Sequence, residues 1–66
     1  MTAQELYEEM RAGANEGSTV RDSLDYACGY YRGAKNEDGL FHPWEQLPET
    51  IKDAFALRAA PWLKRH

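Results

Sequence analysis

The clearest pattern in the chain is a stripe of apolar residues between residues 20 and 31. Its members recur at the spacing of one helix face: Val20, Leu24, Ala27, Cys28 and Tyr31. Ser18 or Thr19 can cap the start of such a helix, and Gly33 is suited to end it in a left-handed conformation. The pattern therefore predicts a helix that begins after these two polar residues and ends near Gly33.

The first residues predict another helix, starting at about Ala3. Thr2 followed three places later by Glu5 fits a capping box, in which the hydroxyl and the carboxylate satisfy the first free backbone amides. Gly13 and Gly17 leave the end of this helix open. Its inner face is expected at four apolar positions: Ala3, Leu6, Met10 and Ala14.

A polar turn over residues 35–39 precedes an aromatic segment that contains the prolines Pro43 and Pro48. We expect Pro43 to begin a single helical turn and Pro48 to be the first residue of a last helix. Helical spacing continues through five positions: Ile51, Ala54, Phe55, Arg58 and Ala59. Pro61 should end or kink this helix near Ala60, so that Trp62 and Leu63 fold back on the core.

Composition supports helices over sheet, because Val20 and Ile51 are the sole β-branched apolar residues. The predicted fold is all-α: one domain over residues 1–66, a small three-helix domain with a short proline-initiated turn before the last helix. The expected core contains twelve residues: Leu6, Met10, Val20, Leu24, Cys28, Tyr31, Phe41, Trp44, Leu47, Ile51, Phe55 and Trp62. Nine of the apolar residues are alanines. The core is therefore small, and a partner subunit can supply part of it.

Charge and cysteine content narrow the function classes. The net charge is −3, with −3 over residues 1–19 and +1 over residues 41–66, whereas nucleic-acid binding usually needs clustered lysine and arginine. One cysteine excludes an intramolecular disulfide, and the chain has neither a leader-like start nor an apolar run long enough to span a bilayer. We therefore expect a cytoplasmic protein without membrane contact, and nucleic acid is an unfavoured partner.

Cys28 and His42 are the only residue pair that can be proposed for nucleophilic catalysis, since a thiol needs a base to act as a nucleophile at neutral pH. The helical stripe turns Cys28 inward, where cysteine usually behaves as a small hydrophobic residue. One cysteine and two distant histidines do not form a zinc site. The carboxylates, including Asp25, have the pattern of solvated surface groups. The prediction is a protein that is not an enzyme and has no catalytic residues, cofactor or metal.

Two tyrosines, Tyr26 and Tyr30, flank the stripe instead of joining it. With Arg32 and Lys35 they are expected to form an aromatic and basic patch, and Trp44 is a further contact candidate, because tyrosine, tryptophan and arginine are enriched at interface hot spots. Two alternatives stay open at this point. The last segment of the chain can cover the tyrosines, and Trp44 can belong to the core.

The segment Pro43-Trp44-Glu45-Gln46-Leu47-Pro48-Glu49, continued by Lys52 and Phe55, resembles a W-E-x-L-P pattern found in small bacteriophage and prophage proteins. A looser resemblance links the chain to the ryanodine-receptor repeat family. The matching positions there are Tyr31, Gly33, Asp38, His42, Pro43, Trp44, Leu47 and Pro48. Neither resemblance implies an activity or catalytic residues. The first implies a phage origin, a location in the host cytoplasm and a role in binding a host protein.

These observations predict a non-enzymatic accessory protein of phage or prophage type that binds a host or phage protein. The predicted contact residues are Tyr26, Tyr30, Arg32, Lys35 and Trp44. Self-association into a homo-oligomer is compatible with this hypothesis. The alternative is a small nucleic-acid-binding regulator that uses the positive last third of the chain with Arg21, Arg32 and Lys35. An enzyme built on Cys28 and His42 is a third hypothesis.

Overall fold

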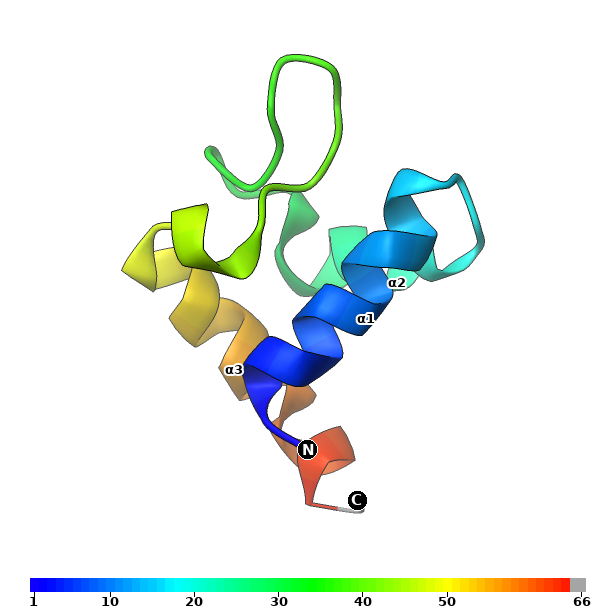
Figure 1. Cartoon of the computed structure of the whole chain (residues 1–66). Helices are drawn as coiled ribbons and strands as arrows, with labels where there is room; N and C mark the ends of the chain where they lie inside the picture. The colour runs from blue at the N-terminus through cyan, green and yellow to red at the C-terminus, as the bar shows by residue number, and fades with distance from the viewer. Residues whose placement is uncertain (65–66) are drawn as a thin grey trace.

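A computed structural model describes residues 1–64 and confirms the predicted all-α, three-helix fold (Figure 1). The elements in chain order are α1 (Ala3–Asn15), α2 (Val20–Leu24), the π-helical turn η1 (Asp25–Gly29), the 3₁₀ turn η2 (Trp44–Gln46) and α3 (Glu49–Leu63). Helix α2 runs directly into η1, so the two act as one helical segment packed between α1 and α3. In Figure 1 the loop before η2 rises at the end of the molecule opposite the N-terminus.

Helix α1 begins with the predicted capping box. The backbone N–H of Glu5 donates to Thr2 Oγ1 at 3.1 Å, and the Thr2 N–H donates to Glu5 Oε1 at 2.8 Å. The inner face of α1 differs from the prediction, because Tyr7 is fully buried whereas Leu6 and Met10 are half-buried. Tyr7 turns inward because its hydroxyl finds an acceptor there, the carbonyl oxygen of His42.

The second helix ends earlier than predicted, at Gly29 instead of Gly33. After η1 the backbone continues in tight turns, in which Tyr31 N–H bonds to the Cys28 carbonyl and Ala34 N–H to that of Tyr31. Gly33 has the expected positive φ, +99°, but within those turns. Tyr31 is 44% exposed, so its place in the predicted core is wrong. A π turn holds more residues than an α turn, which shifts the later positions off the apolar face.

The helical turn predicted to begin at Pro43 is confirmed, because Pro43 directly precedes η2. Pro48 lies one place earlier than predicted, as the residue before the first turn of α3. Pro61 does not end α3, which continues to Leu63. A proline leaves the carbonyl four residues earlier without its N–H donor. Here that residue is Leu57, which is 77% exposed, so water can serve the carbonyl and the helix tolerates the proline.

Among residues 1–64, the core contains ten buried residues: Tyr7, Ala14, Leu24, Cys28, Ala34, Phe41, Leu47, Ile51, Phe55 and Ala59. Its aromatic centre joins three elements. The Tyr7 ring lies 5.5 Å from both the Trp44 and Phe55 rings, between centroids. Trp44 is half-buried and packs against the core, as do Leu6, Met10 and Val20. Trp62 is 50% exposed. Its place in the predicted core is wrong, because α3 continues through Pro61 and does not fold back.

Candidate functional site

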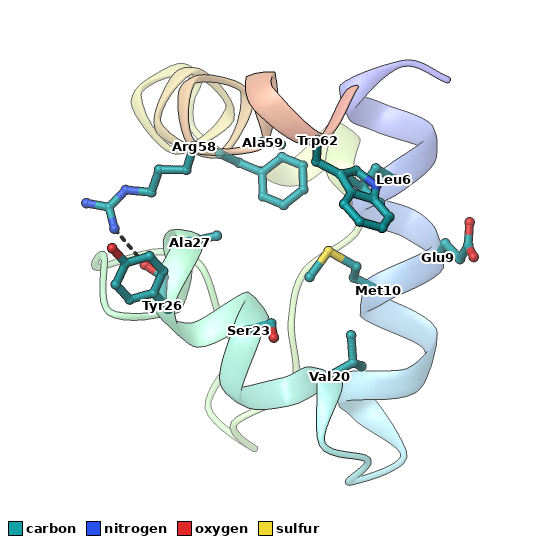
Figure 2. A pocket seen from close by; sticks show the side chains of 11 residues that line it. Leu6, Glu9, Met10, Val20, Ser23, Tyr26, Ala27, Arg58, Ala59 and Trp62 are labelled. Carbon is teal, nitrogen blue, oxygen red and sulfur yellow. Dashed lines mark hydrogen bonds between the residues drawn. The ribbon is translucent and has the colours of Figure 1, made fainter. Parts of the chain in front are cut away.

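A depression with a volume of about 640 Å³ lies between α1, the α2–η1 segment and α3 (Figure 2). We call it the apolar groove. Most of its lining side chains are apolar, and every main helix contributes to it. The lining residues are Leu6, Glu9, Met10, Val20, Ser23, Tyr26, Ala27, Phe55, Arg58, Ala59 and Trp62.

The groove exists because several expected core residues are covered on one side only. Leu6, Met10, Val20 and Ala27 pack against the buried cluster and are half-buried. Their remaining surface faces the groove, as Figure 2 shows for Met10 and Val20. Three helices of this length enclose the buried core around Tyr7 but leave the face that these side chains share open. The result is a concave apolar surface at the junction of three helical elements, a common location for binding sites.

One edge of the groove is fixed by a contact between α3 and η1. Arg58 Nη1 donates a hydrogen bond to the backbone carbonyl of Tyr26 at 2.8 Å, and the guanidinium lies 5.2 Å from the centre of the Tyr26 ring. The dashed line in Figure 2 marks this bond. A cation that caps a carbonyl near the end of a helical segment is stabilising. Tyr26 and Arg58 therefore form an ordered rim, although Tyr26 is 72% exposed.

A second, smaller hollow of about 230 Å³ lies on the other side of this rim, lined by Asp25, Tyr26, Tyr30, Tyr31 and Arg58. Tyr30 is 84% exposed. The alternative that the last segment of the chain covers Tyr26 and Tyr30 is therefore wrong. The exposed tyrosine flank is real, and through Tyr26 it is continuous with the apolar groove.

The other predicted contact residues do not join the tyrosines in one patch. Lys35 Nζ lies 2.7 Å from Asp25 Oδ1 and 5.1 Å from the centre of the Phe41 ring. Its ammonium group therefore forms an ion pair and a cation–π contact within the fold. Trp44 packs against Tyr7 and Phe55 and lines neither the groove nor the hollow. Arg32 is exposed. The expected aromatic and basic patch is thus corrected to an aromatic flank, with Lys35 and Trp44 as supports of the core.

Asp25 is not the solvated surface group that its pattern predicts. Its side chain is 16% exposed, and it points across η1 toward Lys35. Gly29 makes room for it, because a Cβ built there would lie 2.3 Å from Asp25 Oδ1 and 3.1 Å from the Phe41 ring. The π turn, the ion pair and the glycine form one unit that positions Tyr26 at the rim of the groove.

Cys28 is fully buried, and burial raises the pKa of its thiol to about 11, so the thiolate is scarce at neutral pH. His42 contributes its carbonyl oxygen to the bond with Tyr7. Within the described part of the chain, no three metal-ligating side chains converge.

Two of the basic residues named for nucleic-acid binding are engaged within the fold. Arg21 Nη2 donates to the Gly39 carbonyl at 3.4 Å, and Lys35 pairs with Asp25. Among residues 1–64, no helix is both long and apolar enough to cross a membrane.

Comparison with protein-family models, curated proteins and solved structures finds no match to this chain. The resemblance of the Trp44–Pro48 segment to phage proteins therefore stays a prediction.

Proposed function

We propose that the chain is a non-enzymatic accessory protein of phage or prophage type, which acts by binding another protein through the apolar groove. The observation that carries this proposal is the groove itself, which has a volume of about 640 Å³ and is lined mainly by apolar side chains from all three main helices. A 66-residue chain has few large apolar residues, yet it leaves several of them half-covered on one face. A concave apolar surface of this kind commonly marks an interaction site.

The occupant that suits the groove is an amphipathic helix of the partner. The volume lies within the roughly 300–1,000 Å³ range of ligand clefts, but the rim is open, with Tyr26 72% and Trp62 50% exposed. Small-molecule pockets usually enclose most of their ligand, whereas a helix lays one apolar face into a groove and keeps the other in water.

The tyrosine flank extends this proposed contact. Tyr26 belongs to both depressions, so a helix in the groove that passes the Tyr26–Arg58 rim reaches Tyr30. Tyrosine and tryptophan contribute large contact areas for little loss of side-chain entropy. We therefore propose Tyr26 as a central contact, with Tyr30 and Arg32 at the periphery.

A peptide-display selection tests the proposal. The full chain is immobilised and challenged with a library of 15-residue peptides that carry an apolar stripe at helical spacing, and with a library in which the same residues are scrambled. We expect enrichment from the striped library alone. Chemical shifts in nuclear magnetic resonance spectra should then change at Met10, Ala27 and Ala59 when a selected peptide is added.

Three results would overturn the proposal. One is equal recovery from the striped and scrambled libraries. Another is a set of shift changes confined to Tyr30 and Arg32, outside the groove. The third is a wild-type dimer in sedimentation velocity that becomes a monomer on Ala27→Gln, in the groove lining, because the occupant would then be a second copy of this chain.

A further inference from the structure

We infer that the outer side of α3 is a self-association surface, through which two copies of the chain form a weak antiparallel dimer. Its contact residues recur along one side of the helix and its C-terminal cap: Asp53, Leu57, Ala60 and Lys64. We call these four residues the outer stripe. The inference goes beyond the proposed function, because the outer stripe and the apolar groove lie on opposite sides of α3.

The outer stripe is the exposed side of a helix that packs against α1 and η1 along its inner side (Figure 1). With 3.6 residues per turn, its spacings of four, three and four residues keep all members within about 60° of one another around the helix axis. Lys64 continues the helical path, with φ −69° and ψ −19°. Leu57 is 77% exposed, and Asp53 and Lys64 are exposed. Phe55 and Trp62, which line the groove, lie on the other side.

Helix α3 has apolar side chains on both of these sides. Ile51 and Phe55 are buried in the core, whereas Leu57 points outward between the half-buried Ala56 and Ala60. A helix that is apolar all round is normally covered all round. The small side chains beside Leu57 let a second helix approach closely. The outer stripe therefore has the shape and polarity of a helix-packing surface.

The two charges of the outer stripe select a second copy as the partner. Asp53 and Lys64 lie eleven residues apart, which is about 16 Å along a helix. Neither has an opposite charge three or four residues away, and neither side chain joins a hydrogen bond or an ion pair among residues 1–64. A two-fold axis between residues 58 and 59 places Asp53 of each copy against Lys64 of the other. Both charges are then paired at once.

The same register matches the apolar positions. Leu57 of one copy lies opposite Ala60 of the other, so each large side chain meets a small one. A parallel pair would instead place Asp53 against Asp53 and Lys64 against Lys64, which is repulsive. The outer stripe is itself neutral, and the net charge of −3 equals that of residues 1–19, outside α3. At physiological salt, exposed charges more than about 8 Å apart are largely screened.

Sedimentation equilibrium of the full chain tests the inference. One helix pair covers less than the roughly 1,200 Å² of a standard interface, so the dimer should be weak. We expect a weight-average mass near 7.6 kDa at about 20 µM and at least about 1.5-fold higher at about 1 mM. Leu57→Gln should stay a monomer throughout, with a wild-type circular dichroism spectrum because Leu57 is exposed. Leu40→Gln, a change of another exposed leucine, is the matched control and should associate like wild type.

Charge swaps test the antiparallel register. Asp53→Lys and Lys64→Glu should each weaken association at least about threefold at low salt, because each puts two like-charged pairs into the dimer. The double variant should associate within about twofold of wild type, since it restores both pairs in reverse. An equimolar mixture of the single variants should associate more strongly than either alone. If a swap alters the circular dichroism spectrum, Asp53→Asn repeats the test at constant side-chain size, and weaker association is again expected.

Four results would overturn the inference. One is a wild-type mass that stays at 7.6 kDa up to about 1 mM, and another is association that Leu57→Gln leaves unchanged. A third is charge swaps without effect, because the helices would then be parallel or another surface would be the interface. The fourth is association that Ala27→Gln abolishes, since the second copy would then occupy the groove, and this result would overturn the proposed function as well.

Discussion

The hydroxyl of Tyr7 on α1 donates a hydrogen bond to the carbonyl oxygen of His42, 35 residues later in the chain, at 2.5 Å. The next residue on α1, Glu8, accepts a hydrogen bond from the Trp44 backbone N–H at 2.7 Å. Adjacent residues of α1 thus hold the backbone on both sides of Pro43. This arrangement gives the His42–Trp44 segment a structural role, which is to join α1 to the start of α3.

We predict that Tyr7→Phe lowers the free energy of unfolding by about 1–2 kcal/mol. The variant keeps the buried ring but leaves the His42 carbonyl without its donor in a partly buried place. Urea unfolding followed by circular dichroism measures the loss. Tyr30→Phe is the matched control, because Tyr30 is 84% exposed and its variant should stay within about 0.5 kcal/mol of wild type. Equal stability of the two variants would contradict the role given to Tyr7.

Gly29→Ala should destabilise the protein by about 1–3 kcal/mol, although alanine normally stabilises a helix relative to glycine. The new Cβ would lie 2.3 Å from Asp25 Oδ1 and 3.1 Å from the Phe41 ring. The Asp25 carboxylate cannot move freely because it pairs with Lys35 at 2.7 Å. The cost of Gly29→Ala should fall in an Asp25→Ala background, which a double-mutant cycle measures. An increase in stability on Gly29→Ala alone would show that η1 has no such close contact.

The Cys28 thiol should react slowly with iodoacetamide in the native protein and quickly in urea. Its pKa is raised by burial to about 11 from an ordinary 9.0, so at pH 8 the thiolate fraction falls from about 10% to about 0.1%. Because the native state holds this proton more tightly, its contribution to stability is complete below about pH 9 and is lost as the pH rises through 11. Rapid native labelling at pH 8 would instead support the third hypothesis, catalysis by Cys28.

The two exposed tyrosines should contribute unequally to binding of a selected peptide. Tyr26 lines the groove and is ordered by Arg58, whereas Tyr30 lines only the smaller hollow. We expect Tyr26→Ser to weaken binding about tenfold and Tyr30→Ser to weaken it less than about threefold. Fluorescence anisotropy with a labelled peptide compares the two. The opposite order would place the main contact in the hollow.

Features that depend on neighbouring residues could be predicted from the sequence. The capping box of Thr2 and Glu5 and the turn begun by Pro43 each follow from a few adjacent residues. The three-helix fold follows from the apolar spacing and from the scarcity of β-branched residues. The exposure of Tyr26 and Tyr30 also agrees with their positions beside the apolar stripe.

Features set by distant contacts could not be predicted in this way. Whether Leu6 or Tyr7 faces the centre of the core depends on an acceptor at His42, and the shift of Tyr31 to the surface depends on the π turn around Asp25. The groove was missed for a related reason. Periodicity shows which face of each helix is apolar, but it does not show whether three short helices can cover all of that face.

The most direct test of the groove as a protein-binding site compares Ala27→Gln with Ala12→Gln. Ala27 lies in the groove lining, so glutamine there adds bulk and polarity without removing a core side chain; Ala12 is exposed on α1 and outside the groove. Affinities for a selected peptide are measured by fluorescence anisotropy on variants with wild-type circular dichroism spectra. We predict at least about tenfold weaker binding for Ala27→Gln and wild-type binding for Ala12→Gln. Equal affinity of the two variants would contradict binding in the groove.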